Sequence, residues 1–363
     1  MNEIKLPSDI ALIKELSMLF GPSGFETQVA DIIEKKIAPL SDSYVRDKMG
    51  NLICLVRCGD INAAERTKVM LSAHMDEVGL MITEICDDGL LKFDTVGGIN
   101  VSVLEGRKLT VGNEKGTISA LVASKAIHHI ERKDRNKANK IDKLYIDIGA
   151  RDKDEASELV SVGDLATFDS EFYLFGEKDE YMKGKALDDR MGCAALIEVM
   201  ESLFNDRPKN DIDLYFCFTV REEIGLSGAK VAANKIAPDL AIVLESTAIA
   251  DLPDVPPAKR VADVGMGGAL SIADRATIYD RAFVEFALNI GKEENIPVQL
   301  KRYVSGGNDA GSIHKSGVGV RCLALSVPTR YLHSPSCVAS VDDYRSVRRL
   351  VETAVRKIDS ENP

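Results

Sequence analysis

Apolar residues along this chain recur with the spacing of a helix in some segments and of a strand in others. Residues 10–19 and 23–37 place their apolar positions on one helical face, and the segment FGPSG stops the first helix. Residues 51–57 form a strand-like run, and residues 68–73 form a nearly continuous apolar run, as in buried strands. The pattern therefore predicts two helices followed by two strands, with His74 directly after the second strand.

The pattern changes between residues 79 and 175, where short strand-like runs are separated by Gly, Asp and Asn. These runs are LLKFDTV, RKLTVG, GTISALVA, KLYIDIG and LATFD. Many short strands at close spacing indicate a small β-rich domain.

After residue 180, predicted strands alternate with predicted helices. Helices are predicted over 191–204, 225–236, 282–290 and 342–358, and strands over 212–220, 240–244, 298–304 and 323–328. Such alternation implies an α/β fold with a mostly parallel sheet flanked by helices on both faces. We therefore expect a discontinuous α/β domain formed by residues 1–77 and 176–363, with a β-rich insert over residues 78–175.

Composition and charge restrict the class of protein. The chain has 363 residues, with 46 basic and 57 acidic side chains and a formal net charge of −11. Nucleic acids and anionic membranes attract Lys and Arg, so we expect neither as a partner. No apolar stretch reaches the roughly 18 residues of a membrane helix, and the polar start MNEIKLPSDIALIKEL lacks the layout of a secretory signal. Seven scattered cysteines without a C-x-x-C pair predict free, mostly buried thiols and a cytoplasmic location.

Candidate chemistry begins with the motif HMDE, which contains His74 and Asp76. Residues that leave the carboxyl end of a parallel strand face the usual ligand crevice of such sheets. A histidine that binds a metal through one nitrogen usually donates its other N–H to a carboxylate or a carbonyl, so Asp76 fits as the partner of His74. A hydrogen-bonded pair without a metal explains these two residues equally well.

Two pairs of adjacent carboxylates follow. Asp188 and Asp189 precede a predicted helix, where they could cap the helix, and a single carboxylate can also bridge two metal ions. Glu222 and Glu223 follow a predicted strand, and they repel each other unless a positive charge lies beside them. A metal would supply that charge and let one glutamate bind while the other acts as a base. A solvated helix start is the alternative interpretation of this second pair.

Two further residues complete a possible metal site. Glu245 ends a predicted strand, and His333 follows the predicted strand 323–328 across a short loop. Five residues therefore lie at predicted strand ends or βα loops of one domain: His74, Asp188, Glu223, Glu245 and His333. Five nitrogen and oxygen ligands with one shared carboxylate can hold two metal ions, and such a set suits Zn(II), Co(II) or Mn(II).

These motifs give the chain a family resemblance. It resembles the cytosolic TET-type metallo-aminopeptidases, the glutamyl- and leucyl-aminopeptidase group that assembles as tetrahedral dodecamers. The resemblance extends from residue 20 to residue 343 and rests on FGPSGFE, DKMGNLI, LSAHMDEVGLMI, LYIDIGA, GKALDDRMGCAAL, REEIGLSGA, VGMGGALSIADR, GGNDAGSIH and YLHSPSCVASVDD. It implies a di-metal aminopeptidase fold whose inserted β-rich domain builds the oligomer.

The resemblance also implies a role for each candidate ligand. His74 and Glu223 would bind one metal, Glu245 and His333 would bind the other, and Asp188 would bridge the two. Each subunit would therefore hold two divalent ions, zinc or cobalt, with manganese as a further possibility.

One position departs from the family pattern, because the family commonly has aspartate where this chain has Glu245. Glutamate is longer by one methylene and can bind a metal differently. Asp251 matches another acidic position of the family segment, but we prefer Glu245 because it ends the strand.

The resemblance implies hydrolysis of the first peptide bond of short peptides. Glu222 would be the general base that takes a proton from a water activated by the two metals, and Asp76 would orient His74. We expect peptides as substrates and self-association, as a dodecamer, as the main protein contact. The preferred first residue stays open between acidic and apolar side chains, and Arg275, Lys301 and Arg330 are the candidates for a basic pocket.

Two other functions are compatible with parts of this sequence. Paired carboxylates also cleave glycosides, although the absence of Trp and the 6% aromatic content argue against a site that stacks sugar rings. A non-catalytic metal-binding scaffold is the third hypothesis, against which Glu222 beside a full ligand set is the main argument.

Overall fold

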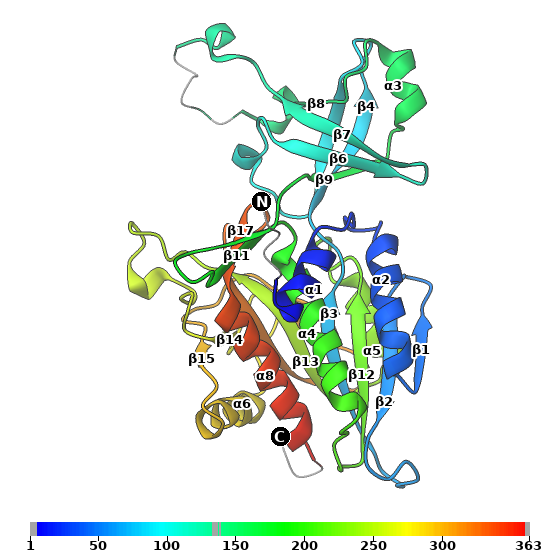
Figure 1. Cartoon of the computed structure of the whole chain (residues 1–363), viewed down its shortest axis with the longest axis vertical. Helices are drawn as coiled ribbons and strands as arrows, with labels where there is room; N and C mark the ends of the chain where they lie inside the picture. The colour runs from blue at the N-terminus through cyan, green and yellow to red at the C-terminus, as the bar shows by residue number, and fades with distance from the viewer. Residues whose placement is uncertain (1–5, 133–136, 138, 360–363) are drawn as a thin grey trace.

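The computed structural model describes residues 6–132, 137 and 139–359. Figure 1 shows an α/β body that contains both ends of the described chain, and a β-barrel that projects from it. The chain leaves the body after β3, forms the barrel, and returns to the body before β10.

The body is built on one large mixed sheet. Its main path runs β1 (Ser43–Arg46), β2 (Leu52–Arg57), β12 (Ile212–Thr219), β3 (Thr67–His74), β13 (Leu240–Ala248), β16 (Arg321–Arg330), β17 (Cys337–Ser340), β11 (Tyr181–Gly184) and β10 (Tyr173–Phe175), with β14 (Gly268–Leu270) and β15 (Val298–Leu300) to one side. The four central strands β12, β3, β13 and β16 are parallel, which confirms the predicted parallel core. Along the main path, the strands on either side of this core pair antiparallel with their neighbours, and most of them are too short to show a clear hydrophobic pattern.

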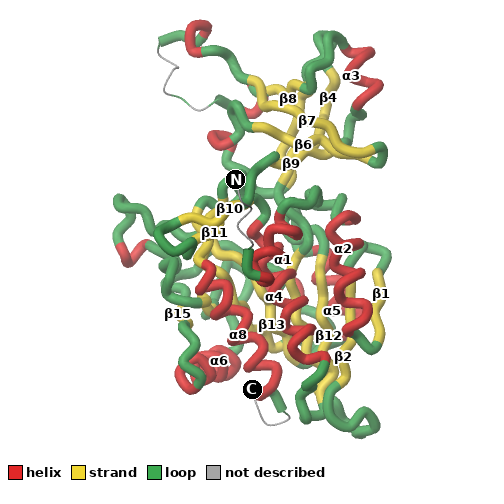
Figure 2. Tube along the Cα trace, viewed as in Figure 1, coloured by secondary structure: helices red, strands yellow, loops and turns green. Residues whose placement is uncertain are grey.

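Helices cover both faces of the sheet (Figure 2). One face carries α1 (Ser8–Ser17), α2 (Thr27–Ile37), α4 (Leu187–Phe204) and α8 (Val341–Lys357), with α6 (Arg281–Glu293) beside α8. Helices α5 (Ser227–Ile236) and α7 (Ala310–Ile313) contact each other and pack on the central strands. Helix α4 is buried almost all round because it lies between the sheet and the other helices, as an apolar helix must.

The insert is a closed six-stranded barrel, which refines the predicted β-rich domain. Its strands are β4 (Gly79–Ile85), β5 (Leu91–Val96), β6 (Lys108–Asn113), β7 (Gly116–Ala123), β8 (Tyr145–Asp147) and β9 (Leu165–Phe168), in the order β4-β5-β8-β7-β6-β9, and helix α3 (Lys153–Leu159) packs against β4. Closure leaves no free strand edge. The barrel has its own apolar core, separate from that of the body.

Two segment limits differ from those that the sequence predicted. Strand β10 belongs to the large sheet, although the predicted insert ran to residue 175, so the exact division into residues 1–77, 78–175 and 176–363 stays a proposal. The strand predicted over 298–304 ends at Leu300, because its partner β14 is only three residues long and offers no further pairing.

The predicted free, mostly buried thiols are confirmed. All seven cysteines are free, and six of them are buried. Within the described ranges, no helix is both long enough and apolar enough to cross a membrane.

A buried group of charges joins the barrel to the body. The Lys185 ammonium, which precedes α4, donates to Glu77 Oε1 at 2.6 Å and to the Leu19 carbonyl at 3.0 Å, and it lies 3.4 Å from Thr167 Oγ1 on β9. The fully buried Arg190 donates through Nε to the Met75 carbonyl at 2.7 Å. Since both cations hold the segment that follows His74, they also fix the start of the barrel relative to the body.

Candidate metal centre

The five predicted ligand residues converge at the carboxyl edge of the parallel core. His74 ends β3, Asp188 lies in the first turn of α4, Glu223 follows β12, Glu245 lies in β13, and His333 follows β16. All of them except His74 line one cavity of about 560 Å³, and His74 is buried directly behind it. The gathering follows from the topology, because parallel strands bring their carboxyl ends to the same side of a sheet.

The shortest distances divide these residues into two half-sites. In the first half-site, His74 Nε2 lies 3.3 Å from Asp188 Oδ1 and 3.7 Å from Glu245 Oε2. In the second half-site, His333 Nε2 lies 3.3 Å from Asp188 Oδ2 and 3.2 Å from Glu223 Oε1. Asp188 therefore presents one carboxylate oxygen to each half-site, the arrangement of a bridging ligand.

This division differs from the pairing that the resemblance implied, which joined His74 to Glu223 and Glu245 to His333. Strands β3 and β13 are neighbours, and Glu245 is still within β13, so its side chain lies beside His74. Glu223 lies four residues beyond the end of β12 and reaches His333. His74, Asp188 and Glu223 also offer ligand atoms within 4.8 Å of one another, but the shorter distances place Glu223 with His333.

Each histidine is held by a backbone carbonyl behind it. His74 Nδ1 lies 3.0 Å from the Asp76 carbonyl, and His333 Nδ1 lies 2.7 Å from the Gly98 carbonyl. A carbonyl only accepts, so each ring has a proton on Nδ1, and each turns Nε2 towards the carboxylates. Histidines that bind metals are held in the same way.

Asp76 does more than the sequence predicted. Its carboxylate lies 3.4 Å from His74 Nδ1, farther away than its own carbonyl. The same carboxylate accepts the backbone N–H groups of Glu222 at 3.0 Å and Glu223 at 3.2 Å, and the Ser23 hydroxyl at 2.5 Å. Asp76 therefore fixes the backbone of the two neighbouring glutamates as well as the loop that carries His74.

Several residues beside the site have left-handed backbone conformations. Ala186 has φ +48°, Arg221 has φ +57° and His333 has φ +57°. Such conformations are unfavourable for residues with a Cβ, and they concentrate at functional sites where the surrounding structure enforces them. Ala186 lies just before α4, which carries Asp188, and Arg221 lies directly before Glu222. His333 is itself a candidate ligand.

The unsatisfied acceptors in this region fit a bound cation. Asp189 Oδ2 and Glu245 Oε1 are buried and have no hydrogen-bond partner. Buried acceptors without a partner are costly, and several carboxylates within a few ångströms repel one another. Divalent cations that prefer nitrogen and oxygen ligands would relieve both costs.

Burial and contacts between the candidate ligands shift the pKa values of their side chains. Burial raises the pKa of Glu245 well above its usual range. Burial alone would lower the pKa of His333, but hydrogen bonds to Asp188 and Glu223 raise it to about 11. Burial also opposes the charged form of Asp188, yet hydrogen bonds from His333 and His74 lower its pKa below the usual range. Protons therefore compete with any cation for this site.

Comparison with known proteins identifies the family. The sequence profile of the M42 glutamyl aminopeptidases matches residues 50–350. This chain belongs to that family. It is therefore a metallo-aminopeptidase, a hydrolase.

Its relatives resemble it over nearly their whole length. A putative aminopeptidase of Acetivibrio thermocellus is 36% identical over 344 residues, which are 95% of this chain and 97% of that protein. The TET aminopeptidase of Thaumarchaeota archaeon SCGC AB-539-E09 superposes with a TM-score of 0.92, at 34% identity and 97% coverage of each chain. The TET1 peptidase of Pyrococcus horikoshii, which can assemble into a tetrahedron or a large octahedral shell, has a TM-score of 0.84 at 33% identity, with 97% and 100% coverage.

Two buried carboxylates of this M42 aminopeptidase were not selected from the sequence. Asp189 lies with His74 and Glu245 in a group that could hold a metal ion, and its only sequence signal was its place beside Asp188. Asp309 accepts the Thr219 hydroxyl at 2.6 Å, has a second oxygen without a partner, and has a pKa that burial raises to about 6. Asp309 belongs to the motif GGNDAG, which supported the resemblance without indicating a role.

The candidate Asp251 is excluded from the site by its partner. Arg330 Nε donates to Asp251 Oδ1 at 2.8 Å, and Arg330 Nη2 lies 2.5 Å from Asp251 Oδ2. This ion pair occupies both side chains, so Arg330 is also a poor candidate for binding an acidic substrate. Of the three basic candidates, only Lys301 lines the cavity of the candidate metal centre.

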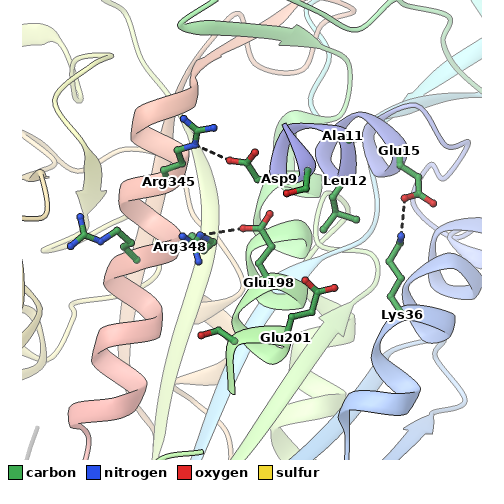
Figure 3. Close-up of a pocket in the computed structure, with 12 residues that line it drawn as sticks. Asp9, Ala11, Leu12, Glu15, Lys36, Glu198, Glu201, Arg345 and Arg348 are labelled. Atoms are coloured by element: carbon green, nitrogen blue, oxygen red, sulfur yellow. Dashed lines mark hydrogen bonds and ion pairs between the residues drawn. The ribbon is translucent and has the colours of Figure 1, made fainter. Parts of the chain in front are cut away.

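A larger cavity, of about 860 Å³, lies between α1, α4 and α8 (Figure 3). Most of the charges around it already have partners: Arg345 binds Asp9 at 2.8 Å, Arg348 binds Glu198 at 3.2 Å, and Lys36 binds Glu15 at 2.8 Å. Its lining contains no histidine and none of the candidate ligands. Volume alone therefore does not locate the catalytic site of this protein.

Proposed function

We propose that this M42 aminopeptidase removes the first residue of short peptides with the help of two divalent metal ions. The first ion would be held by His74, Glu245 and Asp188, and the second by His333, Glu223 and Asp188. The observation that carries the proposal is Asp188, whose two oxygens lie at 3.3 Å from the Nε2 atoms of the two histidines. Zinc or cobalt suits this ligand set, and manganese is also compatible.

Glu222 is the proposed general base. Its carboxylate lines the cavity, lies 4.0 Å from His74 Nε2, and is 12% exposed. Burial raises its pKa well above the usual value, which suits a group that must take and return a proton near neutral pH. When bound, the two cations would polarise the scissile carbonyl and lower the pKa of the attacking water. Glu222 would take the proton of that water and pass it to the leaving amine.

Substrate selection follows from the shape and charge of the cavity. The carboxylates around the half-sites favour the free α-ammonium group at the start of a peptide. Gly306 and Gly307 line the same cavity and allow the backbone to approach a bound peptide closely. A volume of about 560 Å³ suits a few residues of a short or unfolded peptide.

We also propose that the protein self-associates through its barrel as a tetrahedral dodecamer and acts in the cytoplasm. Support comes from the TET1 peptidase, whose structures include a dodecamer and a tetrahedron, and from coverage of nearly the whole chain in both comparisons. The net charge of −11 supports the expectation that neither nucleic acid nor membrane is a partner.

The test is turnover of a panel of amino-acid p-nitroanilides, with and without EDTA, followed by addition of Co(II) or Zn(II). Release from one or a few residues that EDTA abolishes and metal restores is the expected result. Absence of release from every residue, with metal shown to be bound, would contradict the proposal and favour a scaffold. Glycoside cleavage that survives EDTA would favour the two-carboxylate glycosidase instead.

A further inference from the structure

The insert barrel reaches into the second half-site. Gly97 and Gly98 follow β5 of the barrel, and the Gly98 carbonyl accepts the Nδ1–H of His333 at 2.7 Å. This hydrogen bond joins two residues that are 235 positions apart in sequence. A barrel residue therefore supplies the backbone acceptor that orients a histidine of the α/β body.

Gly97 lies against the other residue of the same half-site. Its φ is +82°, and a Cβ placed there would lie 3.3 Å from Glu223 Cβ and 2.9 Å from Val78 Cγ1. A Cβ on Gly98 would lie 3.5 Å from His333 Nδ1, an ordinary contact distance. The Gly97–Gly98 turn is therefore in close contact with both Glu223 and His333, and Gly97 has no room for a side chain.

The first half-site lacks this dependence. His74 is oriented by the carbonyl of Asp76, two residues away in its own segment, and Glu245 lies within strand β13. His333, in contrast, follows β16 in a loop with φ +57° and is 27% exposed. The His333 side chain is far more exposed than that of His74, which is 1% exposed, so its orientation depends more strongly on the hydrogen bond to Gly98.

We propose that the Gly97–Gly98 turn is a positioning segment for the second half-site, and that the barrel thereby controls one of the two metal positions. The proposal rests on the ligand set given under Proposed function. Displacing the turn moves the Gly98 carbonyl away from His333 and pushes on Glu223, while the first half-site keeps its geometry. Loss of such an orienting partner typically weakens metal binding 10–100-fold.

The variant Gly97→Ala tests the proposal, with Gly149→Ala as its matched control. Gly149 is also in the insert and has φ +81°, but a Cβ there would have no atom within 4 Å. Both variants therefore carry the same backbone cost, and only Gly97→Ala disturbs the half-site. The measurement is calorimetric titration of the EDTA-treated protein with Zn(II), together with metal content per chain after dialysis.

We expect two binding events in the wild type and in Gly149→Ala. In Gly97→Ala, one event should be unchanged and the other weakened 10–100-fold, with about one ion retained per chain. Gly98→Ala, which keeps the carbonyl and meets only an ordinary contact, should bind both ions like the wild type.

Three results would overturn the proposal. Gly97→Ala could bind both ions with wild-type affinity, or it could lose both affinities equally, which would indicate general disruption. A wild type that binds fewer than two ions would instead overturn the ligand set itself, and the positioning role with it. Should Gly97→Ala not fold, adding Val78→Ala removes the 2.9 Å contact and keeps the one with Glu223, so the same selective loss is expected.

Discussion

Glu222 and Glu223 are adjacent in sequence, but their carboxylates face different partners. Glu223 lies 3.2 Å from His333, whereas Glu222 lies 4.0 Å from His74 and lines the cavity. The Asp76 carboxylate accepts the backbone N–H groups of Glu222 and Glu223 and so fixes the backbone at both residues. The two side chains point in different directions from this fixed backbone. One glutamate can therefore bind a metal while its neighbour remains available as a base.

At the residue scale, we predict that Glu222→Gln retains both metal ions and loses most turnover. A general base contributes roughly 10²–10⁴-fold to rate, so kcat should fall by about that factor with little change in KM. Metal content and kcat should be measured on the same preparation. Glu201→Gln, on the exposed side of α4, is the control. Near-full activity of Glu222→Gln would show that another group is the base.

Metal affinity should fall as the pH is lowered. Without a cation, hydrogen bonds to Asp188 and Glu223 raise the pKa of His333 to about 11, so the ring carries an extra proton at neutral pH. A metal must displace that proton, and binding therefore strengthens as the pH rises towards this pKa. Zn(II) or Co(II) titrations between about pH 6 and pH 8, in buffers of different ionisation enthalpy, would report the protons released. An affinity independent of pH would contradict this assignment.

At the element scale, Asn51 supports the corner between β12 and α5 that carries the two glutamates. Its Oδ1 accepts the Val220 N–H at 3.1 Å, and its Nδ2 donates to the Gly228 carbonyl at 3.1 Å and to Asp47 Oδ2 at 2.7 Å. Asn51 is fully buried, so no water can replace these bonds at the surface. The corner is thus held by a side chain that lies far away in sequence.

We predict that Asn51→Ala destabilises the protein and lowers its activity. It leaves the Val220 N–H and the Gly228 carbonyl without this partner, and an unsatisfied buried polar group costs about 1–3 kcal/mol. Thermal and denaturant unfolding would measure the loss, with Asn62→Ala, at an exposed position, as the control. An unchanged free energy of unfolding would mean that other contacts hold the corner.

At the scale of the whole molecule, the barrel links assembly to the metal centre. It projects from the body in Figure 1, and its Gly97–Gly98 turn meets His333 and Glu223. Lys185 also holds the start of the barrel to the body. If the barrel builds the oligomer, the same domain would also contact the second half-site, which contains His333 and Glu223.

Light scattering should give a particle of twelve chains, each of 39.5 kDa, for the metal-loaded protein. The expectation rests on the dodecameric relative and on the insert, which carries exposed apolar side chains such as Leu121 on β7 and Val162 in the turn before β9. A mass of one or two chains under the same conditions would contradict the proposed dodecamer. Replacing Leu121 with a charged residue is a direct probe, with replacement of the exposed Val318 of the body as the control.

The sequence alone was sufficient to propose most of the candidate catalytic residues. The apolar runs before His74, Glu222 and Glu245 predict strands, and parallel strands must end on the same side of a sheet. Residue type and position were therefore sufficient to select the candidate ligands, the base and the family. The same local patterns predicted the α/β body and a separate β-rich insert.

Only the tertiary structure decided how these residues pair and what supports them. Asp188 faces both histidines, Glu245 lies beside His74, and Glu223 lies beside His333. These neighbours depend on the order of the strands in the sheet and on how far each side chain extends, which the sequence does not give. The carbonyl that orients His333 comes from Gly98. Every residue has a backbone carbonyl, so the residue type could not indicate this role. Closure of the barrel likewise depends on pairing between strands that are distant in sequence, and the alternation of apolar and polar residues within one strand does not specify its partner.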